Sequence, residues 1–183
     1  MHEGPSTGSA AASPVHAADA LFAEVYARLK AMAARQRARG ASGATLETTA
    51  LVHELYLRMS TGRELLFDHQ AQFFAYAARA MRHLLADRAR DRLRHRAGGE
   101  WMRITLTGGS QQFAIESAEQ ALALDAALQR LQDIDARAAN VLELHYFAGL
   151  TIDQIAVTLD VARSTVDRDW RFARAFLKNE IGR

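Results

Sequence analysis

Aromatic and arginine side chains follow one another closely between positions 73 and 96. Phe73, Phe74 and Tyr76 precede Arg79 and Arg82. Five further arginines follow, at positions 88, 90, 92, 94 and 96. Aromatic rings can stack on unpaired bases while guanidinium groups hold the phosphate backbone. The pattern therefore indicates single-stranded DNA binding.

The same stretch also fits a purely structural interpretation. Taken alone, Phe73 and Phe74 favour a place in the hydrophobic core. Two i,i+3 ion pairs would then form on a solvated helix face, namely Asp87–Arg90 and Asp91–Arg94. Under either interpretation we expect the arginine run to need a polyanionic partner.

A second stretch, from Thr151 to Lys178, has the spacing of a helix-turn-helix. Thr151 can cap a helix whose apolar residues recur at i, i+3, i+4 and i+7, namely Ile152, Ile155, Ala156 and Leu159. Asp160 stands where the turn needs a residue that tolerates left-handed φ, and Val161 fills the corner. Ala156 is short enough for two helices to cross closely. The alternative is an ordinary helical hairpin with a solvated charged face.

The second helix of this pair is predicted to begin at Arg163 or Ser164 and to have two faces. Its inward residues are Val166, Trp170, Ala173 and Leu177. Its outward residues are Asp167, Arg171, Arg174 and Lys178. Side chains at the start of such a helix can reach base edges in the major groove, while basic residues farther along hold phosphates.

Charge is distributed unevenly along the 183 residues, although the formal net charge is only +2. Residues 79–103 carry a net +5 and residues 104–143 a net −4. All but two of the 23 basic residues are arginines. Their planar forks suit phosphates and bases, although a GC-rich coding bias would explain the excess equally well.

Helical periodicity predicts the elements that must position these residues. Helices are expected at 18–38, about 48–59, about 70–95, around the leucines at 122–131, and at 136–147, with Gly149 as a C-cap. Segment 97–117 has four glycines and no sustained helical period, so we place a domain boundary there. No credible strand is found. The predicted fold is all-α: a disordered tail 1–17, a helical domain 18–96, a flexible linker 97–117 and a helix-turn-helix domain 118–183.

Three stretches together resemble a bacterial RNA polymerase sigma factor of the extracytoplasmic-function (ECF) type, over roughly 18–181. They are "TALVHELYLRM" at 49–59, "FFAYAARAMRHLLADRARDR" at 73–92 and "LELHYFAGLTIDQIAVTLDVARSTVDRDWRFARAFL" at 142–177. The last is the most specific. The first two are convincing mainly through their order and spacing.

The resemblance implies that residues 18–96 correspond to sigma region two. Its second helix would dock on the clamp coiled coil of core RNA polymerase, through Leu51, Val52, Glu54, Leu55 and Arg58. Its third helix would melt and read the minus-ten element, through Phe73, Phe74, Tyr76, Arg79, Arg82, His83, Arg88 and Arg90. The loop at about 60–70 would hold a flipped base.

The resemblance further implies that residues 118–183 correspond to sigma region four, which contacts the polymerase flap and reads the minus-thirty-five element. The residues implied in this DNA contact are Arg163, Ser164, Thr165, Asp167, Arg168, Arg171 and Arg174. The linker would thread toward the polymerase interior. The partners implied are core polymerase, promoter DNA, and an anti-sigma factor or a Ser/Thr kinase.

Three departures from the family pattern affect which of the family's contacts we expect this chain to make. Family members often carry acidic residues where this chain has "LETTALVHEL", so phosphate on Thr49 or Thr48 could restore negative charge at a helix N-terminus; a plain N-cap threonine is the alternative. The usual Arg-Asn of the melting helix has Arg82-His83 as its nearest match. Asp167 replaces a usual basic residue, and a carboxylate can accept a hydrogen bond from cytosine N4.

Other function classes are less well supported. A dimeric helix-turn-helix regulator acting without polymerase is the main alternative. An enzyme is not expected, because His53-Glu54 lacks a second histidine at position 57 for a zinc helix, and no cofactor or metal site is expected. The absence of cysteine and of a run of about 20 apolar residues favours a cytoplasmic protein without a membrane span.

Overall fold

The computed structural model describes residues 70–94, 104–108 and 111–181. It also describes eight helical residues nearer the N-terminus, namely Ala23, Tyr26, Ala27, Ala50, His53, Glu54, Leu55 and Leu57. The elements of the described part are α3 (Gln70–Arg94), β1 (Ile104–Gly108), β2 (Gln111–Ile115), α4 (Ala118–Ile134), α5 (Ala136–Tyr146), α6 (Ile152–Leu159) and α7 (Arg163–Ile181). The described chain is mostly helical, as predicted.

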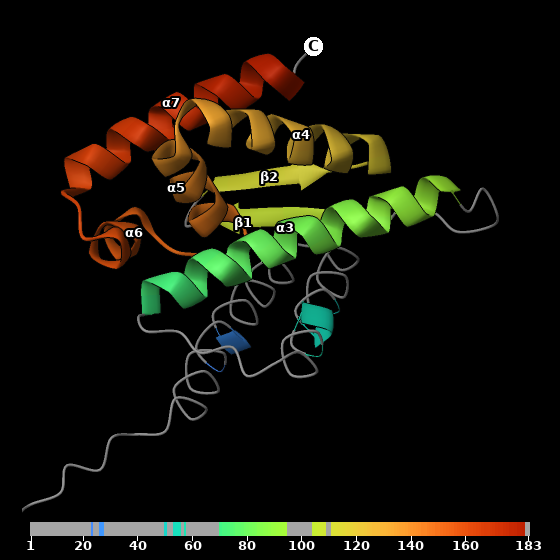
Figure 1. Cartoon of the computed structure of the whole chain (residues 1–183), viewed down its shortest axis with the longest axis horizontal. Helices are drawn as coiled ribbons and strands as arrows, with labels where there is room; N and C mark the ends of the chain where they lie inside the picture. The colour runs from blue at the N-terminus through green and yellow to red at the C-terminus, as the bar shows by residue number, and fades with distance from the viewer. Residues whose placement is uncertain are drawn as a thin grey trace, which may run out of the picture.

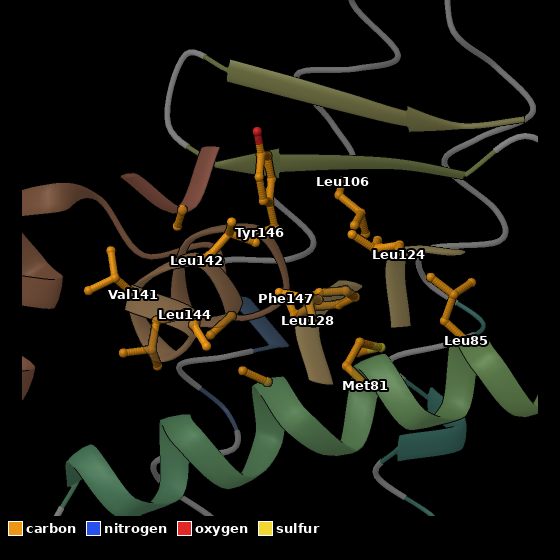
Figure 2. Packing of buried hydrophobic residues seen from close by; sticks show 14 of the residues in the cluster. Met81, Leu85, Leu106, Leu124, Leu128, Val141, Leu142, Leu144, Tyr146 and Phe147 are labelled. Carbon is orange, nitrogen blue, oxygen red and sulfur yellow. The ribbon is translucent and has the colours of Figure 1, made fainter. Parts of the chain in front are cut away.

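The long helix α3 packs on α4 and α5, while β1 packs on α5 and β2 packs on α4 (Figure 1). Met81 and Leu85 point from α3 toward the layer that holds Leu124, Leu128 and Phe147 (Figure 2). One cluster of buried apolar side chains runs through α3, both strands and α4 to α7. A layout of two bundles separated by a flexible linker is therefore not confirmed, because α3 packs directly on α4 and α5.

Residues 104–115 contain an antiparallel β-hairpin. Ile104 pairs with Ile115 and Gly108 with Gln111. Ile104, Leu106 and Ile115 are buried beneath it, and β1 packs on α5. The prediction that the sequence contains no strand is wrong here, because five-residue strands with period-two alternation can bury one face against helices.

Side-chain caps begin helices α4 and α5. The Ser117 hydroxyl accepts a hydrogen bond from Gln120 N to begin α4, and the Asp135 carboxylate accepts one from Ala138 N to begin α5. Gly149 has φ 69°, a left-handed value that glycine adopts without strain, just after the end of α5. The predicted helices from residue 70 onward are confirmed, with α4 longer than the leucine pattern alone suggested. The bounds of the helices predicted at 18–38 and 48–59 lie outside the described residues.

Among the described residues, no helix is both long and apolar enough to cross a membrane. The same part of the chain holds no cluster of three or more His, Cys, Asp or Glu side chains that could bind a metal ion.

Candidate DNA and polymerase interface

Helices α6 and α7 are joined by a tight turn. Its geometry depends on Thr151, Asp160 and Val161. Thr151 caps α6 with a full capping box, because its hydroxyl accepts from Gln154 N while the Gln154 side chain accepts from Thr151 N. Asp160 ends α6 in the left-handed region, at φ 52° and ψ 49°. Val161 N then donates to Ala156 O, at 3.0 Å. The turn residue predicted to accept left-handed φ does so.

Four inward residues of α7 anchor the helix to the core. Val166, Trp170, Ala173 and Leu177 are all buried, as predicted. The Trp170 ring lies edge-on to His145, with 4.3 Å between ring centroids. The seam between α5 and α7 is therefore aromatic, and it fixes the rotation of α7 about its own axis.

Two polar contacts reinforce that seam. His145 Nδ1 donates to the Leu150 carbonyl at 2.8 Å and so ties the end of α5 to the loop before α6. Arg137 at the start of α5 donates twice to the buried Asp169 carboxylate, from Nε at 2.5 Å and from a terminal nitrogen at 3.2 Å. These hydrogen bonds raise the pKa of Arg137. The opposite face of α7 is thereby held toward solvent.

That outer face carries the residues implied in minus-thirty-five contact. Arg163, Ser164, Arg168, Arg171 and Arg174 are exposed, while Thr165 and Asp167 are half-buried. Arg163 forms ion pairs with Asp153 of α6, at 2.8 Å, and with Asp167, at 3.6 Å. The structure thus brings this set together on one helix, with Arg163 already neutralised by two carboxylates.

The residues implied in minus-ten contact divide into two groups on α3. Tyr76, Arg79, His83 and Arg90 are exposed. Phe73 and Phe74 are fully buried and lie edge-on to each other, at 5.8 Å between centroids. In this conformation neither phenylalanine can stack on a base. Both belong to the hydrophobic core, as the purely structural interpretation expected. The pairs Asp87–Arg90 and Asp91–Arg94 form as predicted.

Arg82 is buried at the interface between α3 and the C-terminal helices, not exposed to a DNA strand. One terminal nitrogen donates to Asp125 Oδ1 at 3.0 Å, and Nε lies 2.9 Å from Glu143 Oε1. The other terminal nitrogen donates to His83 Nε2 at 3.2 Å. Partial burial and the charge on Arg82 lower the pKa of His83. The enclosure of this arginine was not predicted.

The residues implied in polymerase docking are only partly described. Leu55 is buried, with 2% of its surface exposed, so it is not available to a partner in this conformation. Glu54 accepts two hydrogen bonds from Arg88 of α3, at 2.8 and 3.2 Å. Leu57, which was not predicted as a contact, is 59% exposed on the same helical segment. Leu51, Val52, Arg58, Thr48 and Thr49 lie outside the described residues.

Asp125, Glu143 and Asp169 are functional candidates that the sequence pattern did not identify. Each is almost fully buried and each faces an arginine. Acidic residues at inward positions of amphipathic helices were a usable signal, because a buried carboxylate needs a cationic partner.

A family model for ECF sigma factors matches residues 13–183. This chain belongs to the ECF sigma factor family. No curated protein and no solved structure matched the chain. ECF sigma factors are transcription factors that act with core RNA polymerase at promoters, and anti-sigma factors are among their partners. In this ECF sigma factor, α7 presents an exposed basic face, while part of the basic face of α3 is covered by α4 and α5.

Proposed function

We propose that this sigma factor directs core RNA polymerase to promoters by reading the minus-thirty-five element with α6 and α7 and melting the minus-ten element with α3. The observation that carries the proposal is the division of α7 into a buried aromatic and apolar stripe and an exposed arginine face. Such a helix, preceded by a tight turn and a shorter helix, suits entry into the major groove.

Within α7, Arg168 is the best candidate for direct base reading. Its side chain is 70% exposed, and its ion-pair distance to Asp169 is a long 4.0 Å. An unconstrained guanidinium near the start of the helix can form a bidentate contact with guanine O6 and N7. Asp167, one position earlier, would accept from cytosine N4, and Arg174, farther along, would hold a phosphate.

At the minus-ten element, Tyr76 would supply the stacking surface and Arg79 and Arg90 the backbone contacts. These three side chains are exposed on α3, whereas Phe73 and Phe74 are buried in the core and anchor the helix there. Base flipping costs a few kcal/mol, which stacking and pocket contacts must offset. The proposed flipped-base loop, 60–70, lies almost wholly outside the described residues.

Polymerase docking is proposed for the helical segment around residues 51–58. The exposed Leu57 suits an apolar contact with the clamp coiled coil, and Glu54 is already paired with Arg88. Because acidic residues are sparse before this segment, phosphorylation of Thr49 or Thr48 by a Ser/Thr kinase would add the negative charge that docking needs. A Thr49→Glu variant should then bind core polymerase more tightly than the unmodified protein. Equal affinity would contradict the kinase proposal.

Run-off transcription tests the proposed function directly. The full chain is added to bacterial core polymerase with a genomic promoter library, with and without Thr49→Glu. We expect initiation from a limited set of promoters that share elements near −35 and −10. Initiation from none would overturn the proposal. Tight binding to a palindrome without polymerase would instead support the dimeric regulator, which the family membership does not favour.

A further inference from the structure

The face of α3 that meets the C-terminal helices has a charged centre. Arg82 of α3, Asp125 of α4 and Glu143 of α5 are 6%, 4% and 1% exposed. A terminal nitrogen of Arg82 donates to both Oδ1 and the backbone carbonyl of Asp125, at 3.0 and 3.3 Å. This arginine therefore links three helices from inside the protein.

Two exposed arginines of α3 reach the same carboxylates from the rim. Arg90 donates to Asp125 Oδ2 at 3.2 Å, and Arg79 Nε lies 3.9 Å from Glu143 Oε2. Both side chains are 50% exposed. Arg79 and Arg90 are about 16 Å apart along the helix axis, so with Arg82 they span about three turns of α3. The two carboxylates thus contact three arginines of α3 that are implied in minus-ten contact.

The charged centre is incompletely satisfied. Although Arg82 Nε and Glu143 Oε1 are 2.9 Å apart, their angle is not that of a hydrogen bond. Among the described residues, Arg82 Nε and Glu143 Oε2 have no hydrogen-bond partner. Burial raises the pKa of Glu143, against the opposing effect of Arg82 and Arg79. A buried ion pair that lacks full hydrogen bonding recovers little of the free energy that its desolvation costs. An anion that forms better hydrogen bonds with the arginine can therefore displace the carboxylate.

We propose that Asp125 and Glu143 compete with the phosphates of promoter DNA for Arg79, Arg82 and Arg90, and so keep α3 closed in the free protein. The inference rests on the proposed role of α3 at the minus-ten element. Opening exposes Arg82 and hydrates Glu143, and DNA then binds the open form. Because DNA binds only the open population, its apparent affinity is reduced by the fraction of protein that is closed.

The test uses fluorescence anisotropy of a labelled single-stranded oligonucleotide carrying a minus-ten element, with the full chain and core polymerase. In the double variant Asp125→Asn with Glu143→Gln, the shape is kept but Arg82 loses both carboxylates. We expect this variant to bind the strand at least tenfold more tightly than the wild type. Adding Arg79→Ala and Arg90→Ala should abolish the gain.

A matched control removes two negative charges elsewhere. Glu119→Gln with Asp133→Asn changes two exposed carboxylates of α4 and should leave affinity within twofold of wild type. Equal tightening in the control would show a net-charge effect and overturn the proposal. Equal affinity of wild type and the Asp125/Glu143 variant would also overturn it, while leaving the minus-ten role of α3 intact. Failure of both proteins to bind would instead contradict the proposed function.

A second measurement does not depend on the stability of that variant. The chain has no cysteine, so Leu93→Cys on α3 and Ala175→Cys on α7 give two exposed labelling positions for energy transfer. We expect transfer to fall when the minus-ten strand and core polymerase are added to the otherwise wild-type protein. Unchanged transfer on a bound strand would show that α3 binds without opening, and would contradict the competition.

Discussion

Arg137 and Asp169 join the first turn of α5 to the middle of α7 through two hydrogen bonds, at 2.5 and 3.2 Å. Asp169 is 4% exposed and lies next to Arg168 and Trp170. The pair therefore couples the folding of the C-terminal helices to the rotation of the proposed recognition helix.

The first prediction concerns this pair. Asp169→Asn keeps the size of the side chain but removes the charge that Arg137 contacts, so the midpoint of urea unfolding should fall. Asp153→Asn is the control, because it breaks the exposed pair with Arg163, which contributes little in high dielectric. Equal shifts in the two midpoints would show that the buried pair stabilises the protein no more than the exposed pair does.

The second prediction separates base reading from phosphate binding on α7. Arg168→Ala should lower promoter-specific transcription by about tenfold to a hundredfold, and relax the preference at one base pair. Arg174→Ala should weaken binding to all promoter sequences alike and reduce the slope of affinity against salt by about one. Binding of core polymerase, measured by gel filtration, should be unchanged in both. Full activity of Arg168→Ala would contradict the proposed readout.

The third prediction follows from His83. Its pKa is lowered, first by partial burial and then by the charge on Arg82, so the folded state binds a proton less readily than the unfolded chain. The contribution of the neutral ring to the free energy of unfolding is complete above pH 6.5, the ordinary pKa of histidine. It is lost as the pH falls below that value and through the lowered pKa of the folded state. Urea unfolding between pH 7.5 and 5.5 should therefore show a smaller loss for His83→Gln than for wild type. Parallel losses would exclude His83 as the cause.

The fourth prediction tests the cap of α6. Thr151→Ala removes the hydroxyl that accepts from Gln154 N and should destabilise the protein by about 1 kcal/mol. Thr151→Ser keeps the hydroxyl and should remain within a few tenths of a kcal/mol of wild type. Thermal or urea unfolding provides the measurement. Similar losses for both variants would mean that the methyl group, not the hydrogen bond, matters.

Local features of this chain were well predicted from the sequence because their causes lie within one or two helical turns. The Thr151 cap, the left-handed Asp160 and the inward stripe ending at Leu177 all depend on near neighbours. The i,i+3 pairs of α3 formed for the same reason. These features account for the helices and for the exposed face of α7.

Features that depend on distant contacts were missed. Arg82 meets Asp125 and Glu143 from 43 and 61 positions away, and the local pattern does not show which carboxylates lie opposite it. The hairpin was missed for a different reason. Its alternation of Ile104, Thr105 and Leu106 was visible, but the glycines around it favoured a linker interpretation.

The hairpin between α3 and α4 also sets how far the two proposed DNA-contacting ends can separate. Pairing of Ile104 with Ile115 holds the ends of a 12-residue segment about 5 Å apart. The same segment, pulled straight, would span about 40 Å. Folded, it acts as a short tether that keeps each end at a high effective concentration near the other. Unpairing of the two strands would lengthen this tether and let the two proposed DNA-contacting ends move apart without straining the covalent link between them.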